Sequence, residues 1–329
     1  MRKHKTMNKF IRSGINFLLK PFDLILQESE QEWERNAFAK LYESRITQVT
    51  QSGVYPAEGI VFSKDRALQL HALLCSYSEK VTTPVPLHIL YYASTPLHQR
   101  AYDEITQIFS DKVSFTRQSF KVSFKDDLVT LLESVQSQKV FFLVDDVLFI
   151  NKFDVREFAK LDTDKIVPSL RMGLNLKKCY TIQKEQPLPE LVSYAGSDED
   201  RIFWRWSQGV HDWSYPLSVD GHFFSTQEIT AITKLIDFSA PNTYEDQLQK
   251  FRPFFVIRLG AGYKKSKIVN IPCNKVQRVN KNIHGDIHQD FLLEQWMKGY
   301  QMDYRSLYGF SNVSAHQEIP FTFIKRDNR

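Results

Sequence analysis

The sequence predicts an α/β fold with a doubly wound, mostly parallel sheet. Its main evidence begins at Gly59, where short apolar runs alternate four times with stretches of helical periodicity. The runs are apolar throughout rather than alternating, as in strands that are buried on both faces of a sheet. In such folds ligands bind at the carboxyl ends of the strands, so we expect the chemistry to follow Phe62, Tyr92 and Val144.

The individual elements follow from these patterns. We expect strands at 60–62, 87–92, 113–115 and 140–144, and helices at 70–77, 101–108 and 128–135. Residues 218–224 read as a further strand with a polar interruption, and 242–248 and 291–300 as later helices. The second half of the chain is less regular, which indicates an irregular region followed by C-terminal helices.

Composition excludes several functional classes. With 43 Lys and Arg against 38 Asp and Glu, the net charge of +5 is too small for a general nucleic-acid binder. The three cysteines are about a hundred residues apart, which fits neither a disulfide framework nor a zinc site and favours a reducing, cytoplasmic location. No Gly-rich phosphate loop is present, so dehydrogenase and ATPase functions are excluded.

The N-terminal fifty residues form a separate region in this interpretation. Six Lys or Arg residues precede the first acid, Asp23, and an apolar stripe at helical spacing includes Ile11, Ile15 and Leu18. This pattern predicts an amphipathic helix that docks on an anionic membrane, at the inner face of the cell membrane, or packs on its own domain. We expect three regions, at 1–50, 51–240 and 241–329.

Two adjacent carboxylates, Asp145 and Asp146, follow the most apolar strand. Like charges this close require a counter-ion, and carboxylate oxygens suit Mg²⁺ or Mn²⁺ bridging to nucleotide phosphates. An ordinary turn followed by a helix cap is the alternative interpretation.

The segments Ile60–Arg66 and Phe142–Phe149, about eighty residues apart, resemble the opening loop and metal-binding segment of GT-A glycosyltransferases, particularly the bacterial family-2-like enzymes. The resemblance covers Gly59 to Asp246 and implies a GT-A-like fold, a nucleotide diphosphate sugar as donor, and Mn²⁺ or Mg²⁺ at Asp145 and Asp146. It also implies that 51–240 is the nucleotide-sugar-binding and catalytic domain, and that the irregular region is acceptor-binding, with the catalytic base and C-terminal helices at 241–329. One departure is that the family's Asp-any-Asp pattern needs an acid at Val144 or Val147.

The same resemblance implies further roles on the donor side. It places the donor near Ser63, Lys64, Asp65, Arg66, Tyr92, Ser94, Lys125, Asp126 and Arg171. Helix caps, exposed cations and a surface ion pair explain these residues equally well from the sequence.

On the acceptor side, aromatic faces can support a sugar ring, so Trp206 and Trp213 are candidates together with Asp220 and His222. Burial in a core is the alternative for the tryptophans. The segment containing Glu245 and Asp246 resembles the Glu-Asp motif of inverting members and predicts Asp246 as general base, then Glu245, then Asp220. Of the late histidines, none has a distinctive motif.

The resemblance therefore implies an inverting enzyme that transfers a monosaccharide from a nucleotide diphosphate sugar to a carbohydrate or lipid-linked glycan, in cell-surface glycan synthesis. Two alternatives remain open. A non-catalytic sugar-nucleotide-binding module would keep the sheet but lack the base, and a metal-dependent nucleotidyltransferase or phosphohydrolase would also use paired carboxylates.

Overall fold

The computed structural model describes residues 30–46, 54–111, 113–118, 121–195, 199–273, 287–320 and 322–326. The chain forms two compact units, 1–47 and 48–329. The first unit contributes the helix α2 (Glu30–Ile46), in which Ala37 and Leu41 are buried. The predicted amphipathic helix at 11–25 lies outside the described residues. Among the helices that are described, none combines the length and apolar character needed to span a bilayer.

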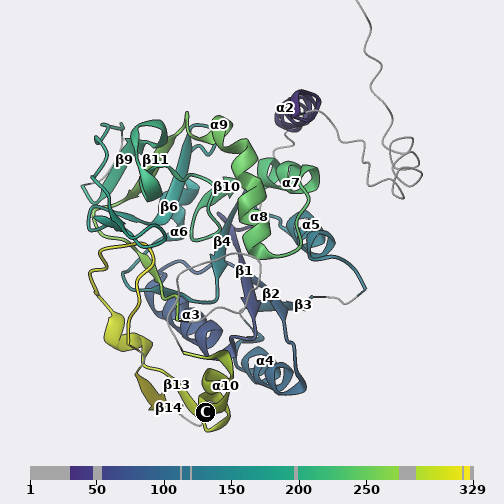
Figure 1. Cartoon of the computed structure of the whole chain (residues 1–329), viewed down its shortest axis with the longest axis vertical. Helices are drawn as coiled ribbons and strands as arrows, with labels where there is room; N and C mark the ends of the chain where they lie inside the picture. The colour runs from purple at the N-terminus through teal and green to yellow at the C-terminus, as the bar shows by residue number, and fades with distance from the viewer. Residues whose placement is uncertain are drawn as a thin grey trace, which may run out of the picture. The chain divides into compact units, whose positions relative to one another are not determined.

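The second unit contains a five-stranded sheet of order β10-β4-β1-β2-β3 (Figure 1). Its strands are β1 (Glu58–Lys64), β2 (Leu87–Tyr92), β3 (Val113–Arg117), β4 (Lys139–Val144) and β10 (Phe223–Ser225). The first four run parallel and only β10 is antiparallel, so the predicted fold class is confirmed. Phe62 pairs with Val144 and Lys64 with Tyr92, which brings three strand ends to one edge of the sheet.

Three crossover helices connect these strands, as predicted. They are α3 (Ala67–Lys80), α4 (Pro96–Phe109) and α5 (Phe124–Ser134). The Thr95 side chain caps α4, and Ser123 with Asp126 forms a capping box on α5, because their side chains accept from backbone N–H groups that the first turn leaves unpaired. Helix α3 packs against α4 and against α10 (Gln289–Met297), whereas α5 packs against α7 (Thr226–Leu235).

Smaller sheets and short helices complete the second unit. A three-stranded sheet has the order β6-β11-β9, and three two-stranded sheets pair β12 with β5, β13 with β14 and β7 with β8. The strands are β5 (Val147–Phe149), β6 (Ile166–Gly173), β7 (Lys178–Cys179), β8 (Lys184–Glu185), β9 (Arg201–Arg205), β11 (Leu259–Tyr263), β12 (Ile268–Asn270), β13 (Tyr300–Met302) and β14 (Phe323–Lys325). The helices are α6 (Val155–Ala159), α8 (Pro241–Leu248), α9 (Arg252–Phe255), η2 (Trp206–Gln208), η3 (His211–Ser214), η4 (Gln249–Phe251) and η5 (Tyr304–Leu307).

Tryptophans form the core beside the three-stranded sheet. The Trp204 ring lies between those of Trp206 and Trp213, with centroids 4.7 and 4.9 Å away, and all three are fully buried. Gly260 on β11 permits this packing, since a Cβ atom there would lie 2.2 Å from the Trp204 ring. Trp206 and Trp213 are therefore core residues, as in the alternative interpretation from the sequence. Their ring faces are covered in this structure, so a sugar has no access to them.

The predicted strand at 218–224 is shorter than expected, because β10 begins only at Phe223. Gly221 has a φ of +75°, a conformation that glycine adopts without strain and that ends regular strand geometry. Its N–H donates to the Phe142 carbonyl and its carbonyl accepts from Leu170, so the turn is anchored to both β4 and β6. This anchored turn carries Asp220 to the edge of the central sheet.

Candidate functional site

Asp145 and Asp146 form the turn between β4 and β5, and one cation bridges them. Nη1 of Arg66 lies 3.0 Å from Oδ1 of Asp145 and 3.2 Å from Oδ2 of Asp146. Burial alone would lower the pKa of Arg66, but the two carboxylates raise it above its ordinary value. The expected counter-charge of the pair is therefore supplied, at least in part, by the loop after β1.

Asp145 is engaged on both oxygens. Besides the Arg66 contact, its Oδ2 accepts from the Ser63 hydroxyl at 2.9 Å and from the Lys64 backbone N–H at 3.1 Å. The Ser63 hydroxyl is also 2.6 Å from the Tyr102 hydroxyl. Asp145 thus connects the end of β1 and the following Arg66 to the end of β4. Its side chain is only 4% exposed.

The remaining predicted donor residues of this edge divide into inward and outward side chains. Asp65 is buried at a φ of 54°, and its Oδ1 accepts from the Ser94 backbone N–H at 2.7 Å, so this carboxylate joins the ends of β1 and β2. Lys64 is exposed, with its Nζ 5.4 Å from the centre of the half-buried Tyr92 ring. Lys64, Tyr92 and the exposed Ser94 are therefore accessible to a ligand.

Asp146 faces a different environment from Asp145. Among the residues that the structure describes, its Oδ1 receives one long hydrogen bond, 3.4 Å from the Asn270 amide. Burial raises the pKa of Asp146, Arg66 opposes this, and the charges of Asp145 and Asp220 raise it further, to about 6. A cation placed against Asp146 would relieve this repulsion.

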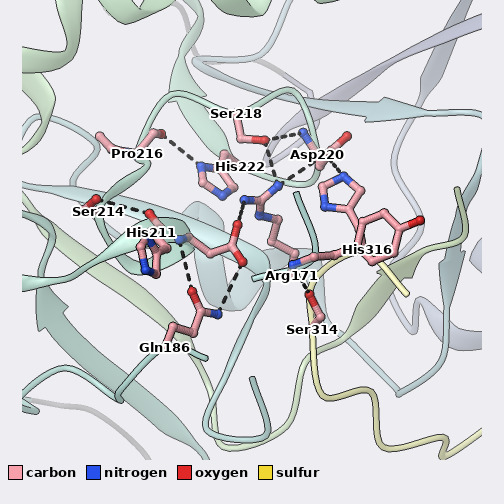
Figure 2. Close-up of polar contacts among 12 residues, drawn as sticks. Arg171, Gln186, His211, Ser214, Pro216, Ser218, Asp220, His222, Ser314 and His316 are labelled. Atoms are coloured by element: carbon pink, nitrogen blue, oxygen red, sulfur yellow. Dashed lines mark hydrogen bonds and ion pairs between the residues drawn. The ribbon is translucent and has the colours of Figure 1, made fainter. Parts of the chain in front are cut away.

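Arg171 is the centre of a second buried group (Figure 2). From β6, its Nη2 donates to Asp212 at 3.0 Å, while Nη1 donates to Ser218 at 3.2 Å and to Asp220 at 3.3 Å. Gln186 holds the other oxygen of Asp212. The Arg171 side chain is 3% exposed and its contacts in this structure are with residues of the protein itself, while its contact with a donor stays a prediction.

His316 joins this group from the C-terminal part of the chain. Its Nε2 lies 3.3 Å from Oδ2 of Asp220. Burial would lower the pKa of His316, but the contact with Asp220 raises it. Burial likewise would raise the pKa of Asp220, yet His316 and Arg171 lower it to about 2. Asp220 is thus an ionised carboxylate that lies between the Arg171 guanidinium and the His316 imidazole.

Glu245 and Asp246 lie on α8 with different surroundings. Glu245 is half-buried, interacts with Ser218 and Tyr215, and is influenced by the charges of Asp220 and Arg171. Burial, followed by the Asp220 charge, raises the pKa of Glu245 to about 7. Asp246 is exposed. Of the two predicted bases, Glu245 is the one that the structure brings to Asp220.

Other predicted residues lie apart from this group or serve within the fold. Lys125 donates to Asp237 at 2.9 Å, and Asp126 completes the capping box of α5. His222 is fully buried, its Nδ1 lies 2.9 Å from the Pro216 carbonyl, and burial lowers its pKa to about 3. His222 is therefore a neutral side chain behind the Arg171 group.

The described residues fit a divalent cation at one aspartate only. Asp145 has both oxygens occupied by protein donors, whereas Oδ1 of Asp146 has the long contact alone. Within the described ranges, no three His, Cys, Asp or Glu side chains converge as a ligand set. A cation would therefore be held by Asp146 together with phosphate oxygens of a substrate, a common arrangement for Mg²⁺.

Sequence reasoning missed Asn270, Asp212 and the role of His316. All three are single polar residues in otherwise ordinary segments, and only the tertiary contacts bring them to the site. The helical phase of α8 was a usable signal, since Tyr244 and Leu248 mark its buried face and Asp246 lies away from them.

Comparison with known proteins supports the predicted family. No family model matches the chain. The bifunctional glycosyltransferase pgtA of Dictyostelium discoideum is 23% identical over 257 residues, which is 68% of this chain and 32% of the relative. The chain therefore spans about a third of the length of this relative. The match confirms the resemblance to glycosyltransferases.

Several solved structures are similar at a distance. TarS 1–349 of S. aureus in complex with UDP-GlcNAc is 15% identical, with a TM-score of 0.38 over 69% of this chain and 60% of that chain. The mannosyltransferase PcManGT of Pyrobaculum calidifontis, in complex with GDP-Man and Mn²⁺, is 14% identical with a TM-score of 0.28, over 42% and 44% of the two chains. A nucleotidyl transferase of Methanothermobacter is 10% identical with a TM-score of 0.33, over 64% and 88%.

Proposed function

We propose that this chain transfers a monosaccharide from a nucleotide diphosphate sugar to a carbohydrate hydroxyl, with inversion at the anomeric carbon. The observation that carries the proposal is the position of Glu245, a carboxyl group with a pKa near neutrality, in the same polar cluster as Asp220 and Asp146. The sequence relationship to a glycosyltransferase supports the same reaction class.

On the donor side, the accessible residues suit a nucleotide. Tyr92 offers a ring face for the base, Lys64 and Ser94 offer hydrogen bonds, and Arg66 supplies positive charge beside Asp146. When bound at Asp146, Mn²⁺ or Mg²⁺ would neutralise charge on the diphosphate. Carboxylates outnumber cations around Asp146 and would repel an incoming diphosphate. A bound Mn²⁺ or Mg²⁺ would offset this repulsion.

On the acceptor side, Glu245 is the proposed general base. It takes the proton of the acceptor hydroxyl as that oxygen bonds to the anomeric carbon, while the bond to the diphosphate breaks and its electron pair leaves with the phosphate. A pKa of about 7 suits this task, because the group is substantially ionised at neutral pH and still basic enough to accept a proton. Asp220 lies beside it as a fixed negative charge.

A donor screen tests the proposal. UDP-GlcNAc and GDP-mannose are the first donors to test, since each is bound in one of the similar structures. Release of UDP or GDP is measured with Mn²⁺, with Mg²⁺ and with EDTA. We expect slow hydrolysis of one donor, lost in Glu245→Gln and retained in Asp246→Asn. Pyrophosphate release from UTP and a sugar 1-phosphate, without donor hydrolysis, would instead establish a nucleotidyltransferase.

We also propose peripheral contact with an anionic membrane, where a lipid-linked glycan acceptor for a cell-surface polymer would be within reach. The support is the sequence of the first 25 residues, in which six cations accompany an apolar stripe. Co-sedimentation with anionic vesicles, compared between the full chain and a variant lacking residues 1–27, tests this contact. Equal binding by both would refute a role of the N-terminal segment.

A further inference from the structure

Residues 312–317, which we call the C-terminal strap, are built into the second unit on one side. The Asn175 amide donates to the Asn312 carbonyl at 2.7 Å, and the Tyr180 N–H donates to the Ser314 hydroxyl at 3.0 Å. Asn312 and Ser314 are buried. Buried polar groups that are satisfied in this way fix a segment in one conformation.

On its other side the strap is paired with Asn270, the last residue of β12. The Asn270 N–H donates to the Ala315 carbonyl at 3.0 Å, and the Gln317 N–H donates to the Asn270 carbonyl at 2.9 Å. The side chain of the same Asn270 reaches Asp146. The strap is therefore connected through one residue to the aspartate at the sheet edge.

Between these two anchors, the strap presents His316 to Asp220, as Figure 2 shows. Asp220 has two donors on the same oxygen, the Arg171 guanidinium and the His316 imidazole, both at 3.3 Å. The Arg171 side chain is 3% exposed, whereas that of His316 is 25% exposed. His316 is thus the donor on the accessible side of Asp220, and Arg171 is the donor on the buried side.

We propose that the C-terminal strap completes the active centre and that His316 is a positioning residue, which holds the Asp220 carboxylate in the orientation that faces Glu245 and the acceptor. This inference depends on the proposed function. Without His316, Asp220 keeps Arg171 and the Asn270 side chain as donors but loses the donor on its accessible side, and it gains a rotational freedom that the intact strap removes. A displacement of about 1 Å in a reacting group is enough to lower turnover by about 10²-fold.

The test uses His316→Ala, His316→Gln and, as a matched control, His288→Ala, whose side chain is 72% exposed at the start of α10. The readouts are kcat and KM for the donor that the wild-type chain hydrolyses, the affinities for the free nucleoside diphosphate and for Mn²⁺, and the melting temperature. We expect His316→Ala to lower kcat by about 10²-fold with donor KM changed by less than about threefold. His316→Gln, which keeps an N–H donor for Asp220, should recover to within about tenfold of the wild-type kcat.

The outcomes separate this inference from the proposed function. No donor hydrolysis by the wild-type chain would refute the proposed function, and this inference with it. Wild-type hydrolysis with an equal kcat in His316→Ala would refute this inference alone. Loss of Mn²⁺ or nucleoside diphosphate affinity without a kcat change would also refute it, because His316 would then contact the metal or the donor directly. If His316→Ala does not fold, the kcat of His316→Gln relative to the wild-type chain, together with its unchanged KM, is the deciding measurement.

Discussion

Nη1 of Arg66 lies 3.0 Å from Oδ1 of Asp145, and this contact gives the two adjacent aspartates different roles. Asp145 is enclosed by the loop after β1, with Ser63 and the Lys64 backbone on its other oxygen. Asp146 shares the guanidinium but keeps one oxygen for a weak contact. Asp145 therefore has a structural role in holding the end of β1 and Arg66, whereas Asp146 is available to a ligand.

Asparagine at each position should separate these roles. In Asp145→Asn the charge-assisted hydrogen bonds to the loop weaken, so we expect a loss of about 1.5 to 3 kcal/mol in the free energy of unfolding. In Asp146→Asn the repulsion from Asp145 and Asp220 is relieved at neutral pH, where the folded-state pKa of about 6 leaves the native group mostly charged. Its melting temperature should stay unchanged or rise, while Mn²⁺-dependent binding of UDP or GDP weakens.

Denaturant unfolding and calorimetric titration of Mn²⁺ and nucleoside diphosphate measure these effects. The opposite pattern, in which Asp145→Asn is as stable as wild type and loses metal affinity, would place the ligand role on Asp145.

Glu245 and Asp246 give a second separation. Glu245→Gln should lower turnover by at least about 10²-fold with donor affinity retained, because the amide cannot accept the acceptor proton. Asp246→Asn, an equal change of charge on the exposed side of α8, should keep nearly full turnover. Steady-state kinetics with the donor found in the screen decides the matter. A large loss of turnover in Asp246→Asn, but not in Glu245→Gln, would identify Asp246 as the general base.

The pH dependence of the reaction should report Glu245. A base acts only when deprotonated, so kcat/KM should fall about tenfold per pH unit below the Glu245 pKa of about 7 and level off above it. The charged groups that influence this pKa are Asp220, Arg171 and His316. Measuring kcat/KM from pH 5.5 to 8.5 checks this fall at low pH. The fall should be absent from the residual activity of Glu245→Gln. A limb below pH 5 would indicate a carboxylate with an ordinary pKa as the base.

The central sheet was predictable because its strands are apolar on both faces and its helices are amphipathic. The runs at 87–92 and 140–144 become β2 and β4 without change in their main extent. The segment at 218–222 was predicted as strand but contains a bend at 219–221, because Gly221 adopts a positive φ to connect two sheets. That conformation depends on partners in β4 and β6, which local periodicity does not contain.

The candidate site was predictable only where its residues follow a strand. Asp146 could be located because it lies in the turn that follows β4, and Arg66 because it comes just after β1. His316 reaches Asp220 across 96 positions of sequence through a strap held by hydrogen bonds. No local pattern encodes such a contact, so a single polar residue of this kind emerges only from tertiary structure.

Two buried arginines test whether Arg171 serves the site or only the fold. Arg258 forms a two-point ion pair with Glu228, at 2.6 and 2.8 Å, and both side chains are at most 4% exposed. Replacing either arginine by methionine removes a guanidinium from buried carboxylates, which costs about 3 to 5 kcal/mol. Both Arg171→Met and Arg258→Met should therefore lower the melting temperature.

Only Arg171→Met should also change catalysis by the folded fraction, because Arg171 fixes Asp220 and Asp212 while Arg258 pairs with Glu228. Turnover is measured well below both melting temperatures and normalised to the nucleoside diphosphate sites counted by titration. We expect kcat in Arg171→Met to fall by about 10²-fold with nucleotide affinity retained, and kcat in Arg258→Met to match wild type. If Arg171→Met instead keeps its kcat and loses nucleotide affinity, Arg171 meets the donor diphosphate during the reaction, and the buried contacts that it makes in this structure open when the donor binds.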